Sequence, residues 1–250
     1  MTDFSSEFDD EEFNADRNQT LFDDGPPNEE EAIQIGALRE ELSDLLATSP
    51  LSKQPENCSD WKLLRFLRGH AGDTGAAAAA FHEMVRFREE SGVNELRDKL
   101  LSQGRRDPSS LQDYKALTSL VQKGLRCCFP VRFDDNMRLL TFLDVGLLNL
   151  RAVLAADLGD MYFEFHLVVE EYTNMILHHL TEARGRLVGR HDIINVSSLG
   201  LTQFNKSCLD LIRRVTSCKK YYPEGVAKVR IFGVFFHIYM HTYIFFDRLM

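Results

Sequence analysis

The chain has 250 residues and a formal net charge of −9, and most of that charge lies at the N-terminus. From Met1 to Glu31 there are twelve acidic residues and one basic residue, a net charge of −11, which leaves about +2 for the remaining residues. The acidic composition therefore does not exclude a folded body that binds phosphate or anionic lipid. The whole chain has 44% hydrophobic residues, so the body can bury one large core or two smaller ones.

The cysteines indicate a reducing compartment. There are five of them, an odd number, and none forms a C-x-x-C pair. The first thirty residues also lack the basic start and the apolar run of a secretory signal. We expect a cytoplasmic protein with neither a disulfide framework nor a zinc site.

The first 28 residues form an acidic tail with spaced phenylalanines and end in Gly25-Pro26-Pro27. This segment has too few apolar groups to offset the entropy lost on ordering, so we predict disorder. Glu12 to Ala15, behind a run of acids, loosely resembles the FFAT motif that docks lipid-transfer proteins onto endoplasmic-reticulum receptors, but it lacks the usual second aromatic. A solvated tail and a tail with a docking partner both stay open.

Helical patterns follow from 29 to 105. Glutamates at 29–31 suit the positive end of a helix dipole, and leucines then recur at helical spacing until Ser49-Pro50. Ser59 or Asp60 is expected to cap a second helix that contains the sequence WKLLRFLRGH. An alanine run then leads into a third helix that ends at Ser91-Gly92. These patterns predict a small helical module over 29–105.

The residues from 106 to 250 alternate between strand and helix patterns. Strands are predicted over 126–131, 138–145, 190–196 and 226–236, with a tight turn at 134–136. Amphipathic helices are predicted over 161–180 and from Cys208 to Val215. The progression predicts an α/β fold in which helices cover a mostly parallel sheet.

Signatures of enzymes and metal sites are missing from the sequence. It contains no phosphate-binding loop, no dinucleotide-binding glycine pattern and no G-x-S-x-G nucleophile elbow. His178 and His179 are adjacent, so on a helix they point about 100° apart and cannot share a metal. The basic group Arg184, Arg186, Arg190 and His191 is interpreted as a solvated loop. We therefore expect no enzyme, no cofactor and no nucleic-acid partner.

Two segments resemble the CRAL-TRIO lipid-transfer family. The first runs from Ser59 to Val93, with an acidic residue, L-L-R-F-L-R, alanines and an F-R pair in the family's order. The second contains IINVSSLG and, after a helix, KKYYPEGVAKVRI up to Ile231. The resemblance thus covers about residues 59–231. It implies a βαβ sheet that forms the floor of an apolar pocket, closed by a helical gate, in which a phospholipid is held without covalent change.

The resemblance also implies site residues. In family members that transfer phosphatidylinositol, the glutamate of Y-Y-P-E contacts the head group, and Glu224 stands at that position. Tyr221 and Tyr222 are the other lipid-binding candidates, although they also suit packing at a helix-to-strand junction. Arg65 and Arg68 match the helical motif and are expected to anchor the helical module by pairing with surface acids. The implied protein is cytoplasmic and associates peripherally with anionic membranes through basic residues of the body: Arg184, Arg186, Arg190, Arg213, Arg214, Lys219 and Lys220.

After Ile231 the sequence departs from the family pattern. The expected gate helix and final strand are replaced by FGVFFHIYMHTYIFFDRLM, so a partial domain over 106–250 without its gate is expected. Residues 231–246 are uncharged, and as a helix they would span about 24 Å, short of the ~30 Å hydrocarbon core. An incomplete pocket would instead favour a non-catalytic interaction or regulatory module, which is the alternative function.

Overall fold

A computed structural model describes residues 25–104, 108, 111–121, 132–145, 147–197, 205–223 and 225–232. Four features predicted from the sequence lie outside this part of the chain. They are the acidic tail up to residue 24, the first predicted strand at 126–131, Glu224, and the segment 233–250.

The N-terminal third is helical, as predicted. Its elements are α2 (Glu29–Glu41), α3 (Ser43–Thr48), the 3-10 turn η1 (Pro50–Lys53), α4 (Pro55–Cys58), α5 (Asp60–Gly69), α6 (Thr74–Glu90) and α7 (Val93–Ser102). Asn28 begins α2 with a capping box, because its side chain accepts from the Glu31 amide while the Glu31 carboxylate accepts from the Asn28 amide. Ser59 caps α5 as expected.

The structure differs from the predicted helices in two places. The first predicted helix is divided at Leu42, which ends α2 and lets α3 turn so that Leu46 also faces the core. The second difference is α7, which was not predicted. Gly92 adopts a positive φ of 64°, a conformation that glycine tolerates, so the chain turns there and a new helix begins at once. The sequence pattern showed the turn but not the helix after it.

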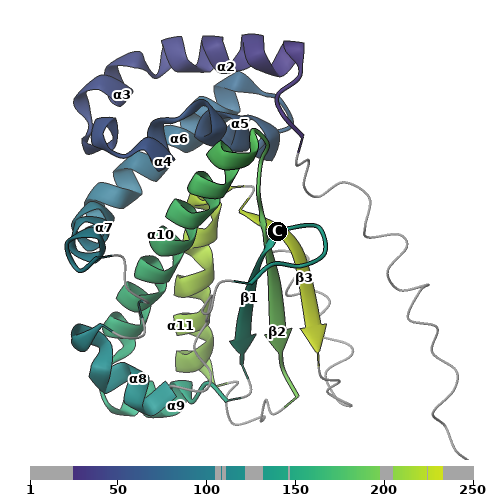
Figure 1. The fold of residues 1–250 in the computed structure, drawn as a ribbon. Coiled ribbons are helices and arrows are strands. Elements are labelled where there is room, and N and C mark those ends of the chain that lie inside the picture. The colour runs from purple at the N-terminus through teal and green to yellow at the C-terminus, as the bar shows by residue number, and fades with distance from the viewer. Residues whose placement is uncertain are drawn as a thin grey trace, which may run out of the picture.

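The body contains a three-stranded parallel sheet in the order β1 (Leu139–Asp144), β2 (Arg190–Asn195), β3 (Val226–Phe232). Its other elements are η3 (Gln112–Tyr114), α8 (Lys115–Val121), α9 (Leu150–Ala155), α10 (Gly159–Arg184), α11 (Lys206–Ser217) and η5 (Cys218–Tyr221). Figure 1 shows α10 and α11 on one side of the sheet and the N-terminal helices across its upper end. The predicted α/β fold with a helical N-terminal region and a parallel sheet is therefore confirmed.

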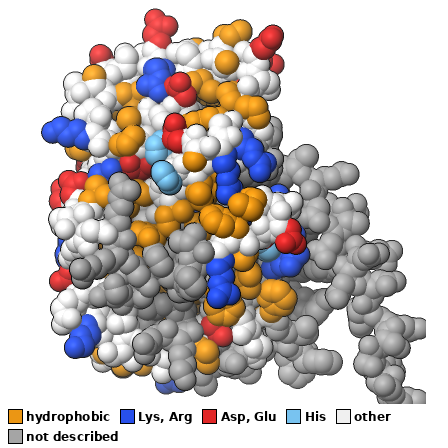
Figure 2. Space-filling model, in the orientation of Figure 1, with side chains coloured by type: hydrophobic (Ala, Val, Ile, Leu, Met, Phe, Trp, Pro, Cys, Tyr) orange, Lys and Arg blue, Asp and Glu red, His pale blue; other side chains and the backbone are white. Residues whose placement is uncertain are grey.

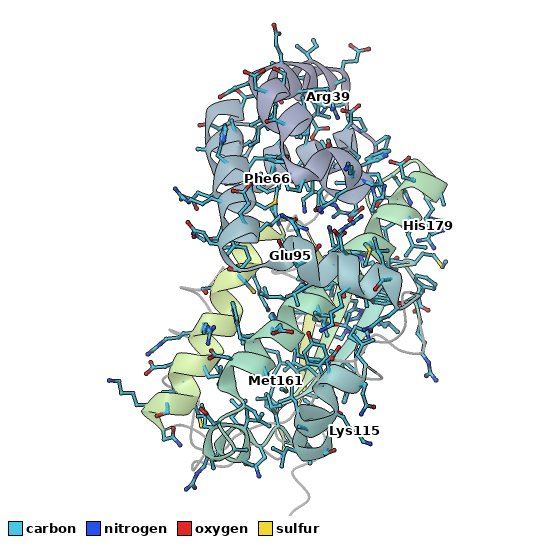
Figure 3. The ribbon with its side chains drawn as sticks, turned by 90° about the vertical axis from the view of Figure 1, so that its left-hand side faces the viewer. Arg39, Phe66, Glu95, Lys115, Met161 and His179 are labelled. Carbon is cyan, nitrogen blue, oxygen red and sulfur yellow. The ribbon has the colours of Figure 1, made fainter. Side chains whose placement is uncertain are left out.

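Helix α10 holds the two parts together. It is 26 residues long, and one cluster of the core gathers on it, with Tyr114 and Phe165 in edge-to-face contact at 5.2 Å between ring centroids. A second cluster lies among α2 to α6, around Phe66 and Phe81. Figure 3 shows α10 running beneath the N-terminal helices and on past them. The contact between these two clusters is where the polar site described next is found.

Candidate functional site

The two tyrosines of the Y-Y-P segment join the body to the N-terminal helices. The ring of Tyr221 stacks on Phe87 of α6, with centroids 4.1 Å apart and planes 15° apart. The Tyr222 hydroxyl donates to Glu171 Oε1 of α10 at 2.7 Å. Both side chains thus pack at the junction before β3. Their predicted contact with lipid stays a prediction.

Arg88 and Glu171 form an ion pair at the centre of this junction. Arg88 donates twice to the carboxylate, at 2.7 and 2.9 Å, and both side chains are almost completely buried. The remaining donors of Arg88 reach Gln54 and Asn94, each at 3.0 Å. Burial alone would raise the pKa of Glu171, but Arg88, with help from Tyr222, lowers it below its usual value. The pair clamps α6 to α10 in a single geometry.

Lys62 of α5 is buried beside this pair. Its ammonium lies 5.6 Å from the centre of the Tyr222 ring and 5.7 Å from that of Phe66. Burial lowers the pKa of Lys62 to about 7, and the positive charges of Arg88 and Arg65 act in the same direction. Glu171 opposes them without compensating fully. At neutral pH the folded protein therefore disfavours the charged form of Lys62.

A small hollow opens next to Lys62 and has room for about one water molecule. It is lined by residues of α5, α10, β2 and the Y-Y-P segment: Lys62, Arg65, Glu170, Thr173, Asn174, Leu177, Arg190, Tyr222, Pro223 and Gly225. Most of these side chains are polar, and cations outnumber anions among them. The hollow is therefore suited to a polar or anionic group and not to an acyl chain.

We predict that Lys62→Met stabilises the fold and flattens its pH dependence. Between pH 7 and 10.5 the unfolded chain binds a proton at Lys62 that the folded chain does not bind, so wild-type stability rises with pH across this window. Below pH 7 the cost of the buried charge is fully present, on the order of a few kcal/mol. Urea unfolding from pH 6 to 10 measures the difference between the two proteins.

The control for that experiment is Lys53→Met, at an exposed lysine of η1. This variant should keep the wild-type slope of stability against pH. If the Lys62→Met protein also keeps the wild-type slope, Lys62 is an ordinary lysine with a normal pKa in the folded state.

A second prediction separates the two partners of Glu171. Glu171→Gln leaves Arg88 buried without a counter-charge and should lower the free energy of unfolding by about 3–5 kcal/mol. Tyr222→Phe removes one hydrogen bond to the same carboxylate and should cost about 1 kcal/mol. Denaturant unfolding of both variants checks the order, and similar losses would show that the ion pair does not dominate.

The two arginines of the L-L-R-F-L-R segment have different partners. Arg68 donates to Glu31 at 2.7 Å and so anchors α5 to the start of α2, as predicted. Arg65 has partners in the body. It is buried and donates to the Val188 carbonyl oxygen at 2.8 Å and to Thr181 Oγ1 at 3.3 Å. This arginine therefore connects the N-terminal helices to the body.

The prediction of a solvated basic group is wrong for Arg190 and His191. Arg190 is buried, donates to Glu170 of α10 and forms an ion pair with Asp192 at 3.0 Å, while the Asp192 carboxylate also accepts from Thr141. His191 is buried as well, with Nδ1 3.0 Å from Asp134. Both belong to β2 and not to a solvated loop, because the strand begins at Arg190. Alternation along the strand turns Arg190 toward α10 and His191 to the opposite face, where Asp134 contacts it.

Other basic residues of the body lie at the surface in ion pairs. Arg213 pairs with Asp210 and Arg214 with Asp160, while Lys220 pairs with Glu83 of α6. Within the described ranges, no helix is both long and apolar enough to cross a bilayer, and the greater part of the apolar segment 231–246 lies outside those ranges. The same described residues contain no cluster of His, Cys, Asp and Glu that could hold a metal ion.

The sheet presents a second surface, on the side turned away from α10. Strand alternation and register place three rows of side chains across it: Leu140, His191 and Lys228; Phe142, Ile193 and Arg230; Asp144, Asn195 and Phe232. Phe142 is 44% exposed and Phe232 is 51% exposed, which is unusual for phenylalanine. We call these nine residues the outer sheet face. It combines exposed aromatics with two cations.

The outer sheet face was not found from the sequence. The resemblance predicted an apolar floor but named no residues for it. The alternation in RLLTFLDV and VAKVRIF gives one signal, because every second residue must share a face. Alternation does not show which of the two faces the helices cover, because that depends on where α10 packs.

The chain is similar in structure to a known protein, although its sequence matches no protein family. No protein-family model matches it, and a search of curated proteins also finds no match. Among solved structures, the crystal structure of Sfh5, a yeast protein of the Sec14 family, is similar with a TM-score of 0.60 and 13% sequence identity. The similarity covers 89% of this chain and 77% of Sfh5. The chain therefore has a Sec14-like fold, which is the fold that the CRAL-TRIO resemblance implied.

Proposed function

We propose that this chain binds a lipid on the outer sheet face and transfers it between membranes without chemical change. The observation that carries the proposal is the Sec14-like fold over 89% of the chain, together with exposed aromatic side chains on the sheet face that α10 does not cover. Burying an acyl chain there gains roughly 0.8 kcal/mol for each methylene. The exposed phenylalanines would form part of the pocket floor.

The ligand we infer is a phospholipid with an anionic head group of the phosphatidylinositol type. The hollow that Tyr222 borders supports this choice, because Lys62 and Arg65 both line it and cations attract phosphate. The hollow lies on the α10 side of the sheet, near the start of β3, so a lipid on the outer sheet face would have to extend around that end of the sheet. We infer that Tyr221, Tyr222 and Glu224 belong to the head-group region, as the family resemblance implies. A head group could occupy the hollow only if the Y-Y-P segment moved away from α5 and α10, since the hollow has room for about one water molecule.

We further infer how the chain is organised and where it acts. Helices α2 to α7 would form the helical module of 29–105, next to a lipid-binding domain over 106–250. One hydrophobic cluster comes mostly from α2 to α6, which supports this division, although Leu187 of the body joins it and Leu100 of α7 belongs to the cluster on α10. The protein would be cytoplasmic and meet membranes peripherally. Lys228 and Arg230 support contact with an anionic surface, and neither forms an ion pair with another described residue.

We predict that glutamates at two phenylalanines of the outer sheet face abolish lipid binding. Phe142→Glu with Phe232→Glu places two carboxylates where acyl chains would lie, so lipid retention should fall at least about tenfold. The measurements are mass spectrometry of lipids that copurify with the full chain and transfer of fluorescent phosphatidylinositol between vesicles.

The matched control is Ile33→Glu, because Ile33 is 74% exposed on α2 and far in sequence from the sheet. This variant should bind lipid like the wild type. If the wild-type chain retains no lipid and moves none, the proposal is wrong, and a non-catalytic interaction module becomes the better explanation of the fold. If the control fails equally, the loss reflects surface charge and not the sheet face.

A further inference from the structure

The outer sheet face carries a lysine and an arginine, Lys228 and Arg230, in neighbouring rows. Lys228 and Arg230 follow each other on the same face of β3, and the described residues provide neither with an ion-pair partner. Their charges reach across the sheet, because both lower the pKa of His191 on β2, in addition to the larger effect of burial. The two carboxylates of the region are already engaged: Asp134 with His191, and Asp144 with Asn195.

The apolar groups beside these cations are also uncovered. Phe142 lies in the same row as Arg230, and Phe232 lies one row further along β3. Figure 2 shows lysine and arginine side chains next to hydrophobic ones over the region where Figure 1 shows the sheet. A segment that matches this surface needs negative charge and aromatic side chains close together.

The N-terminal tail has this composition. Residues 1–24 contain nine acidic residues and one basic residue, with phenylalanines at positions 4, 8, 13 and 22. Four of the acids, at 9–12, stand between two of these phenylalanines. The segment 233–250 is a weaker match, since its single acid and single basic residue, Asp247 and Arg248, cancel. Charge complementarity therefore favours the tail over the C-terminal segment.

The tail also starts in the right place. The described chain begins at Gly25, whose carbonyl oxygen accepts from Arg68, and Figure 1 shows this start above the sheet on the side where β3 lies. A random coil of 24 residues would have a root-mean-square end-to-end distance of about 27 Å, whereas a six-residue strand is about 20 Å long. A segment of 24 residues is therefore long enough to extend along a strand of this sheet.

We propose that the acidic tail binds the outer sheet face of its own chain and competes there with lipid. The acids would pair with Lys228 and Arg230 while the phenylalanines pack on Phe142 and Phe232. The competition rests on the proposed lipid-binding function, but the docking of the tail does not. An intramolecular ligand of this kind would shield the exposed aromatics from water and from other molecules until a membrane displaces it.

The docking is tested by photocrosslinking in the full chain. A photoreactive benzoylphenylalanine replaces Phe8, the dilute protein is irradiated, and the crosslinked peptides are identified by mass spectrometry. We expect monomeric products linked to β1, β2 or β3, with a yield that falls about fivefold or more when salt is raised to about 1 M. Crosslinks confined to the N-terminal helices or to a second chain, or a yield that salt does not change, would overturn the docking.

Charge reversal supplies the matched control. Lys228→Glu with Arg230→Glu should reduce the crosslink to the sheet about fivefold or more. Lys53→Glu with Lys115→Glu makes the same change in net charge at exposed lysines of η1 and α8 and should leave the yield unchanged. Equal losses in both variants would mean that only net charge matters and that the sheet is not the binding site.

The competition is tested with a tail in which the nine acids are replaced by asparagine or glutamine. Uptake of phosphatidylinositol that is a minor component of phosphatidylcholine vesicles should become several-fold faster, because the competing segment is weakened. Unchanged uptake overturns the competition even if the crosslink is present. If no form of the protein takes up lipid while the crosslink forms, the docking stands and the proposed function fails. If lipid is taken up but no crosslink forms, the docking fails and the proposed function stands.

Discussion

The fold depends on the ion pair between Arg88 and Glu171. The two groups lie on different helices, and water reaches neither of them. Removing each charge from water costs several kcal/mol, so the pair is tolerable only when every donor and acceptor is used. Arg88 meets that condition by donating to Gln54 and Asn94 as well, and the Tyr222 hydroxyl donates to the Glu171 carboxylate. Five separate segments must therefore be in place together.

This requirement explains how the N-terminal helices are positioned on the body. An apolar contact tolerates small rotations, whereas hydrogen bonds to a buried carboxylate allow one geometry. Arg65 acts in the same way further along, where it donates to Val188 before β2. Lys62 is the exception, a buried ammonium with aromatic neighbours and a lowered pKa. A residue whose buried charge lowers the stability of the fold so strongly is a candidate for a functional role.

Local patterns were sufficient to predict most elements of the fold. Helical spacing identified α2, α5, α6, α10 and α11, and the apolar runs identified β1, β2 and β3, because these signals depend on residues close in sequence. Glu171 could not be selected as a key residue, since its partner lies 83 positions away. A signal did exist: two adjacent glutamates interrupt an apolar helical stripe. For α7, the turn at Gly92 concealed the helix that follows.

The fate of Arg190 shows why composition could not locate the charged surface. Arg190 and Lys228 lie on neighbouring strands and both look like basic surface residues in the sequence. Alternation along the strands places Arg190 toward α10, where Glu170 and Asp192 neutralise it. The same alternation turns Lys228 and Arg230 to the opposite side, beside exposed phenylalanines. One sheet thus separates charges that hold the fold together from charges left for an external group. Because the unpaired ones border apolar side chains, an amphipathic anion matches that face better than a purely polar or a purely apolar ligand.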